Sequence, residues 1–419
     1  MIGKIKKIYH DYPSQFWVLV FATFVDTMGG WLIFPFFALY ITRKFQVGMT
    51  EVGILLAIYS ISGALGSMIG GALADKFGRK SISIFGLVFS ALSNVLMGVA
   101  TQLWWFYILA LSVGLLSSFG GPARQAMVTD ILPEEKRAEG FSIFRIIFNI
   151  SATVGPIAGG LLASRSYLLL FIADAIASVI TALIVYVKLD ETKPQLSAEQ
   201  AKKSIWTTLV ENKLALSDKV FVGLILPVGL MWAIYTQMMS TLSVYLRDYR
   251  GIPEQGYGAL ISINAIIVIL FQFWITRKLR DKHPLLILVA GTAFLLVGFS
   301  MYAFVSGYSF FVLAMVIITI GEMVNTPTEQ SFVSQIAPKE MRGRYMAVRG
   351  LVMMLFGTSS RLGAGLIMDY LNPEWVWIAT GILAAIAIAL FYNMYLRMGQ
   401  QLSDRIAQGS QIQPAPAGD

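Results

Sequence analysis

Four ionisable side chains lie inside long apolar stretches of the chain, where a charge is costly and therefore informative. They are Asp26, Asp174, Glu322 and Arg361. A charge at the centre of a bilayer costs at least about 2.5–3.5 kcal/mol, so such residues are rare and usually face a cavity or a partner. A carboxyl group in this setting can gain a proton when it is desolvated and lose it when water reaches it. That is the chemistry that proton coupling requires.

The two acids that lie deepest, Glu322 and Asp26, are the candidate proton-coupling residues. Asp26 lies about ten residues into its stretch and Glu322 about fourteen, so Asp26 is roughly 15 Å deep at 1.5 Å per residue. The competing interpretation is a protonated or salt-bridged acid with a structural role. Asp174 lies only about seven residues from the end of its stretch, which favours a solvated or helix-end position. Arg361 is expected to pair with an acid or to hold an anionic group of a substrate.

The elements that carry these residues are predicted to be membrane-spanning helices. Hydrophobic residues make up 56% of the 419, charged residues only 13%, and the mean hydropathy is +0.68. A soluble globular chain carries about a quarter charged residues, whereas recurring charge-free stretches of 18 or more residues indicate helices that cross hydrocarbon. The fold class is therefore an all-α membrane protein. Twelve transmembrane helices are predicted near 15–41, 51–74, 81–100, 104–126, 141–163, 167–188, 220–246, 256–276, 284–305, 308–334, 343–368 and 374–396.

Several functional classes are excluded by composition. The chain has no cysteine, its histidines His10 and His283 lie outside the spans, and it has no glycine-rich phosphate loop. We therefore expect no enzymatic activity, no metal and no cofactor, and a proton gradient rather than ATP as the energy source. The net charge of +8 is distributed over short loops, so nucleic acid is not an expected partner. The expected partners are membrane lipids, protons and a small lipophilic substrate, and the expected functional form is a monomer.

The distribution of basic residues predicts the orientation. Of the 32 Lys and Arg residues, 26 lie in segments on the side of the N-terminus. By the positive-inside rule, the chain is expected to be a multi-pass protein of a bacterial inner membrane, with both termini in the cytoplasm.

An internal repeat divides the chain into two halves. At a constant offset of 205 residues, the segment Gly121–Arg137 matches Thr326–Arg342 with seven identities in 17 positions. An even number of spans separates the copies, which indicates a parallel repeat related by a pseudo-twofold axis along the membrane normal. The predicted domains are two six-helix bundles at 1–189 and 219–397, a cytoplasmic linker at 190–218, and a disordered cytoplasmic tail at 398–419.

Three segments resemble one family of transporters. The loop Gly71–Lys80 reads GALADKFGRK, span 5 contains GPIAGG at Gly155–Gly160, and the segment Pro122–Arg137 ends in DILPEEKR. These segments resemble the major facilitator superfamily, most closely its twelve-helix drug:proton antiporter branch of multidrug efflux transporters. Two positions depart from the family pattern: Ala110 stands where span 4 usually carries an arginine, and Ser151 replaces a glycine upstream of the GPIAGG segment.

The resemblance implies roles for two groups of residues. Asp75 and Arg79, with Asp130 as the partner of Arg79, are implied to clamp the halves in the outward-facing state, and Asp75 can also accept N–H groups at a helix N-terminus. The implied gating residues are Gly71, Asp75, Gly78, Arg79, Lys80 and Asp130. The antiporter-like motif is implied to seal the outward side, although a packing kink is the alternative; it comprises Gly155, Pro156, Gly159 and Gly160.

The remaining candidates are residues that suit a cavity for varied lipophilic molecules, because aromatic and methionine side chains adapt to many shapes. Helix packing or lipid contact is the alternative for each. The predicted substrate-binding residues are Trp31, Phe34, Trp232, Tyr235, Gln237, Met238, Asn264, Met323, Asn325, Met354 and Arg361. The sequence thus predicts proton-coupled efflux of lipophilic or cationic small molecules by alternating access. A lipid or lysolipid transporter, an uncoupled or symporting nutrient transporter, and a ligand-binding sensor remain alternatives.

Overall fold

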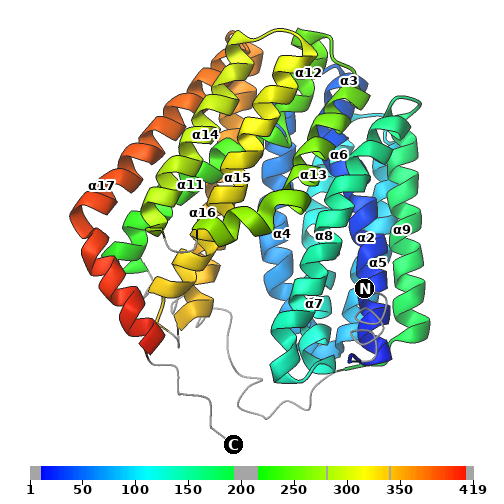
Figure 1. The fold of residues 1–419 in the computed structure, drawn as a ribbon. Coiled ribbons are helices and arrows are strands. Elements are labelled where there is room, and N and C mark those ends of the chain that lie inside the picture. Colours follow the sequence, from blue (N-terminus) through cyan, green and yellow to red (C-terminus); the bar gives the residue numbers. More distant parts are fainter. Residues whose placement is uncertain (1–10, 193–215, 280–281, 339–340, 412–419) are drawn as a thin grey trace, which may run out of the picture. The chain divides into compact units, whose positions relative to one another are not determined.

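The computed structural model is built entirely of helices over the residues that it describes, which are 11–192, 216–279, 282–338 and 341–411 (Figure 1). Within these residues, twelve spans are long and apolar enough to cross a membrane. Their bounds agree with the sequence prediction to within a few residues at most ends. The all-α membrane fold predicted from composition is therefore confirmed.

The helices group into two compact units. Unit 1 comprises Met1–Lys202 together with Met239–Ala265, and unit 2 comprises Lys203–Met238 together with Ile266–Asp419. The segment Met239–Ala265 thus lies with unit 1, although the repeat assigns it to the second half of the sequence. The domain boundaries drawn from the repeat remain a prediction.

Unit 1 is organised around its first helix, which packs against α8 and α9, while α5 packs against α9 and α4 against α6. Its core includes Phe16, Leu19 and Met127, none of which is measurably exposed. The elements of unit 1 are α2 (Ser14–Ile33), η1 (Phe34–Phe36), α3 (Phe37–Phe45), α4 (Met49–Phe77), α5 (Arg79–Val99), α6 (Leu103–Ser117), α7 (Gly120–Ile131), α8 (Glu134–Ala163), α9 (Tyr167–Lys188), α12 (Thr241–Arg250) and the first part of α13 (Glu254–Leu279).

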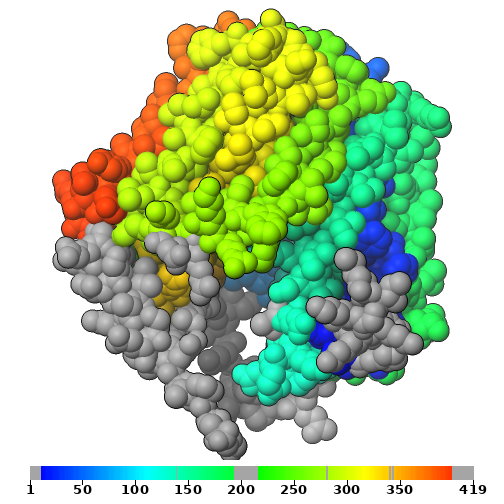
Figure 2. Space-filling view, in the orientation of Figure 1, coloured from blue at the N-terminus to red at the C-terminus, as the bar shows by residue number. Residues whose placement is uncertain are grey.

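In unit 2, α14 packs against α15 and α17, and α11 packs against α16 and α17. The space-filling view shows the side chains of α14 and α15 closing the space between their ribbons (Figure 2). A core cluster that includes Phe221, Phe332 and Phe391 holds these helices together. The elements are α11 (Lys219–Tyr235), η3 (Thr236–Met238), the rest of α13, α14 (Pro284–Phe304), α15 (Tyr308–Ile336), α16 (Arg342–Tyr370) and α17 (Trp375–Gln411).

Four of the predicted segments differ from the helices in the structure. Span 7, predicted near 220–246, divides into α11, η3 and α12, and its apolar span ends at Met238. Span 1 is interrupted by the 3-10 turn η1, because Pro35 cannot donate the backbone hydrogen bond that an α-helix requires. Helix α8 begins at Glu134 rather than near residue 141, directly after Pro133, with two acids in its first turn that suit a helix N-terminus. Helix α17 continues to Gln411, into the segment for which a disordered tail is predicted from 398. Residues 193–215 of the predicted linker and 412–419 of the tail lie outside the described residues.

Candidate functional site

The predicted gating loop forms a tight turn between α4 and α5. Gly78 ends α4 with a φ of 103°, a conformation that favours glycine, and α5 begins at Arg79. Arg79 Nε lies 2.7 Å from Asp130 Oδ2, and Arg79 Nη2 lies 3.2 Å from Asp75 Oδ1. The structure therefore brings together Asp75, Arg79 and Asp130, the three charges that the resemblance links.

The carboxylate at the N-terminus of α5 is Glu191 and not Asp75. Its Oε1 accepts the backbone N–H of Arg79 at 2.7 Å, and Thr192 donates to Asp130 at 3.1 Å. Glu191 follows α9, in the segment predicted as linker, so only the folded structure reveals this contact. It connects the end of α9 to the gating loop.

Asp26, one of the two predicted coupling acids, forms an ion pair with Arg124 of α7. Arg124 Nη2 lies 2.9 Å from Asp26 Oδ2, and both side chains are about one-fifth exposed. Arg124 lies within the fourth span, Leu103–Ile131, and is not among the four ionisable residues that the sequence analysis singled out. The usual family position, Ala110, carries no charge, but this arginine places a positive charge in the same span.

The expectation of a solvated Asp174 is wrong. Its side chain is buried against α2 and α5: Asn94 Nδ2 donates to Asp174 Oδ2 at 2.8 Å, and Gly29 leaves no room for a Cβ beside the carboxylate. The Asp26 carboxylate interacts electrostatically with Asp174, and both acids interact electrostatically with Tyr59. Depth along a helix did not indicate which way the side chain faces.

The antiporter-like motif is a site of close helix contact within unit 1. A Cβ on Gly155 would lie 2.5 Å from Trp31 Cβ, and one on Gly159 would lie 2.6 Å from the carbonyl oxygen of Leu32. On its other side, the Pro156 carbonyl meets Gly258 of α13. The motif therefore allows α8 to approach both α2 and α13, which fits the packing interpretation directly. The sealing role stays a prediction.

A polar cluster next to this contact was not anticipated from the sequence. Glu254, the first residue of α13, accepts hydrogen bonds from Arg43 at 3.0 Å and from Tyr167 at 2.8 Å. Arg247 of α12 donates to the carbonyl oxygen of Leu39 at 2.9 Å. This far-face cluster (Arg43, Tyr167, Arg247 and Glu254) lies at the end of unit 1 opposite the gating loop and joins α12 and α13 to α3 and α9.

In unit 2, Glu322 lies beside an aromatic pair. It forms a hydrogen bond with Tyr235, whose ring stacks on Trp232 with the centroids 5.7 Å apart. Three predicted site residues, from α11 and α15, are thus neighbours. A carboxylate next to stacked rings can attract a cation through both charge and the ring faces.

Unit 2 also contains a buried ion pair that the sequence prediction missed. Glu329 of α15 is 1% exposed at its side chain and accepts two hydrogen bonds from Arg349 of α16, one of them from Nε at 2.8 Å. Together with Arg124, these residues extend the set of charges inside the spans. Because a buried charge needs a partner, a search of the predicted spans for residues of opposite charge could have indicated these pairs.

The other predicted substrate-binding residues differ in exposure. Trp31 is half-buried, with Phe34 and Phe148 edge-on to its ring, and Phe34 is exposed. Arg361 is half-buried, and no acid among the described residues of unit 2 forms an ion pair with it. Met354 is also half-buried, whereas five residues are buried in helix packing and must be uncovered before they can contact a substrate: Gln237, Met238, Asn264, Met323 and Asn325.

The fold and the charged spans define a class, the multi-pass membrane transporter. The sequence profile of the Major Facilitator Superfamily matches residues 19–360, and the chain belongs to this family. It is 29% identical over 373 residues to a Na⁺, Li⁺, K⁺/H⁺ antiporter of Planococcus maritimus, covering 81% of this chain and 86% of that one. It is 24% identical over 389 residues to the multidrug resistance protein MdtH of Shigella dysenteriae, covering 91% and 92%.

A solved structure supports the same fold. A POT family transporter in complex with 5-aminolevulinic acid superimposes with a TM-score of 0.76 at 17% identity, covering 93% of this chain and 97% of that one. The profile match over residues 19–360 identifies the protein as a secondary transporter of the Major Facilitator Superfamily and not an enzyme.

Proposed function

We propose that this transporter exports lipophilic cations in exchange for protons. The observation that carries the proposal is the position of Glu322, which hydrogen-bonds to Tyr235 next to the Trp232–Tyr235 stack. A planar cation can lie against the rings while the carboxylate balances its charge. Protonation of Glu322 removes that attraction, so proton binding and cation binding exclude each other at this position.

The Asp26–Arg124 pair supplies a second element of the proposal. A proton on Asp26 would abolish the charge attraction across the 2.9 Å contact and free Arg124 to seek another partner. The two states would then differ in their affinity for a proton, as any coupled equilibrium requires. We place the protein in a bacterial cell membrane with both termini in the cytoplasm, as its basic loops favour.

The test is active efflux of a fluorescent lipophilic cation from a drug-sensitive bacterium that expresses the protein, with and without a protonophore. Glu322→Gln keeps the shape and hydrogen bonding of the side chain but cannot release a proton. We expect it to lose at least tenfold in protonophore-sensitive efflux and to bind the cation more weakly when purified, because the Gln side chain carries no charge to balance that of the substrate. The control is Gln335→Glu, at an exposed position later in the same helix. Normal, protonophore-sensitive efflux by Glu322→Gln would remove this residue from the mechanism.

A second candidate function is exchange of a monovalent metal cation for protons. It is favoured by the similarity to the Na⁺, Li⁺, K⁺/H⁺ antiporter and by the buried carboxylate of Asp174 beside the amide of Asn94. Everted membrane vesicles distinguish the two. Collapse of a preformed pH gradient by Na⁺, Li⁺ or K⁺ alone supports the second candidate, whereas collapse by the lipophilic cation alone supports the first.

A further inference from the structure

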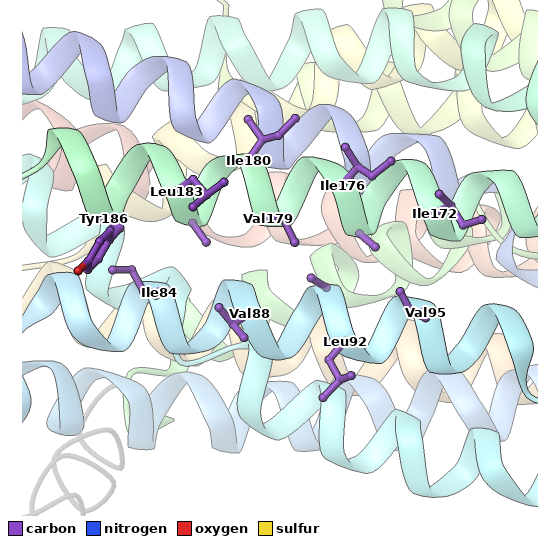
Figure 3. A pocket seen from close by; sticks show the side chains of 13 residues that line it. Ile84, Val88, Leu92, Val95, Ile172, Ile176, Val179, Ile180, Leu183 and Tyr186 are labelled. Carbon is purple, nitrogen blue, oxygen red and sulfur yellow. The ribbon is translucent and has the colours of Figure 1, made fainter.

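A groove runs between α5 and α9 on the outside of unit 1 (Figure 3). Its volume is 640 Å³, and thirteen side chains line it, five from α5 and eight from α9. All are aliphatic except Tyr186, which lies at one end (Figure 3). Val88, Ile176 and Leu183 are each more than half exposed. In a membrane-spanning unit, such an open apolar surface faces the hydrocarbon of the bilayer.

The groove is long enough to hold one acyl chain. On α9 its lining extends from Ile172 to Tyr186, about 21 Å at 1.5 Å per residue. One leaflet contributes about half of the 30 Å hydrocarbon core. An acyl chain from a single leaflet, about 15 Å deep, can therefore occupy about two-thirds of the groove.

The two ends of the groove differ in polarity. Lys80 lies one turn before the lining residue Ile84 on the same face of α5, and its Nζ is 5.5 Å from the centroid of the Tyr186 ring. The Glu191 carboxylate is also at this end, where it accepts the backbone N–H groups of Arg79 and Lys80 at 2.7 and 3.4 Å. The far end continues into exposed Val99 and Leu168. A cation and a phenol at one end of the apolar groove complement the two parts of a phospholipid, its polar headgroup and its apolar acyl chain.

We infer that the groove between α5 and α9 is a specific site for an anionic phospholipid. One acyl chain lies between the two helices, and Lys80, beside Tyr186, binds the phosphate headgroup. The lysine distinguishes this occupant from a transmembrane helix of a second copy, which would need only the apolar surface. Since Lys80 directly follows Arg79, the headgroup lies at the gating loop. This inference is independent of the transported substrate.

The test is native mass spectrometry of the full-length protein in detergent, titrated with phosphatidylglycerol or with phosphatidylcholine of the same acyl chains. We expect one retained phosphatidylglycerol per protein and at least fivefold weaker retention of phosphatidylcholine. Lys80→Gln should weaken phosphatidylglycerol retention about fivefold, since one basic residue near a membrane surface contributes about 1 kcal/mol. Val179→Trp, which fills the groove from an exposed position, should abolish retention, and Ile176→Trp should do the same if Val179→Trp does not fold.

Matched controls come from unit 2. Lys278→Gln removes an exposed lysine in the last turn of α13, and Leu270→Trp enlarges an exposed side chain of the same helix; both should retain lipid like the unaltered chain. The inference is overturned by equal retention of the two lipids, or by unchanged retention in Lys80→Gln or in both groove-filling variants. It is also overturned if glycerol 1-phosphate displaces the lipid, which would mean a site for a free anion. A lipid-free dimer that Val179→Trp disrupts would show that a second copy covers the groove.

Discussion

Where the structure shows an ion-pair partner for a charge inside a span, that partner belongs to the same unit. Asp26 pairs with Arg124, and Glu329 pairs with Arg349 through two hydrogen bonds. Removing ions from water costs several kcal/mol for each, and only a close, hydrogen-bonded partner offsets that cost. Each pair therefore links two helices, and separating them would leave a charge in the interior without its partner.

The Asp26–Arg124 pair can be tested by a double-mutant cycle. Arg124→Gln leaves the Asp26 carboxylate without its cation, so we expect the free energy of unfolding to fall by about 2–3 kcal/mol, less than for a fully buried pair because both side chains are about one-fifth exposed. Adding Asp26→Asn should recover most of that loss, with a coupling energy of about 1–3 kcal/mol. Thermal unfolding in detergent measures all three variants. Strictly additive effects would mean that the two side chains do not interact.

The Glu329–Arg349 pair should be the more sensitive of the two, because the Glu329 side chain is only 1% exposed. Glu329→Gln leaves Arg349 half-paired in the interior, so we expect a loss of about 3–5 kcal/mol in the free energy of unfolding. The matched control is Gln330→Ala, at an exposed position one residue later. Replacing both partners, with Glu329→Leu and Arg349→Met, should restore stability. Unchanged thermal stability in Glu329→Gln would contradict the pairing.

The sequence revealed which residues are unusual but not which residues pair. Asp26 is conspicuous as an acid in an apolar stretch, whereas Arg124 lies near the end of a span and resembles a loop cation. Their contact joins positions 98 apart in the chain, and no local pattern encodes such a pairing. Asp174 was placed by depth alone, but burial depends on which helices surround it.

At the scale of elements, local signals predicted the gating loop well. The spacing from Asp75 to Arg79 indicated the turn, and the pairing of Arg79 with Asp130 that the resemblance implies is present as an ion pair. The gating role of these residues stays a prediction. The contacts made by distant segments could not be read in the same way. Glu191 and the far-face cluster depend on how α9, α12 and α13 pack, so their residues look like ordinary polar loop positions in the sequence.

The far-face cluster should hold the start of α13 against α3 and α9. Glu254→Gln weakens the bonds from Arg43 and Tyr167 by removing the negative charge, because hydrogen bonds to ionised groups are roughly twice as strong as neutral ones. The chain has no cysteine, so Ser262→Cys provides a single reporter on α13 at a position that is only 3% exposed. We expect Glu254→Gln to raise its thiol-labelling rate at least fivefold, by loosening this helix.

The control for this measurement is Glu51→Gln, another carboxylate in the first turn of a unit 1 helix. It should leave the labelling rate at Ser262→Cys unchanged. Equal labelling in the Glu254→Gln and Glu51→Gln backgrounds would show that the cluster does not hold α13.

At the scale of the whole molecule, the repeat preserves the helices but not the ion pairs inside the spans. At the 205-residue offset, Glu329 occupies the position of Arg124, with the opposite sign. Arg124 reaches back to span 1, whereas Glu329 reaches forward to span 11. Roles therefore cannot be transferred from one half to the other by alignment, although the twelve-span architecture can.

The orientation of the whole chain follows from its basic residues and can be tested with fused reporters. With 26 of 32 Lys and Arg on the side of the N-terminus, moving that side across the membrane would carry most of the positive charge outward, which the positive-inside rule disfavours. An alkaline phosphatase fused after Lys203, which lies outside the described residues, should be inactive, whereas one fused near Pro253 should be active. Fusions at His283 and Asn372 should repeat the two results, because α13 and α16 each cross the membrane once. Reversed activities would invert the topology and, with it, the direction of the proposed exchange.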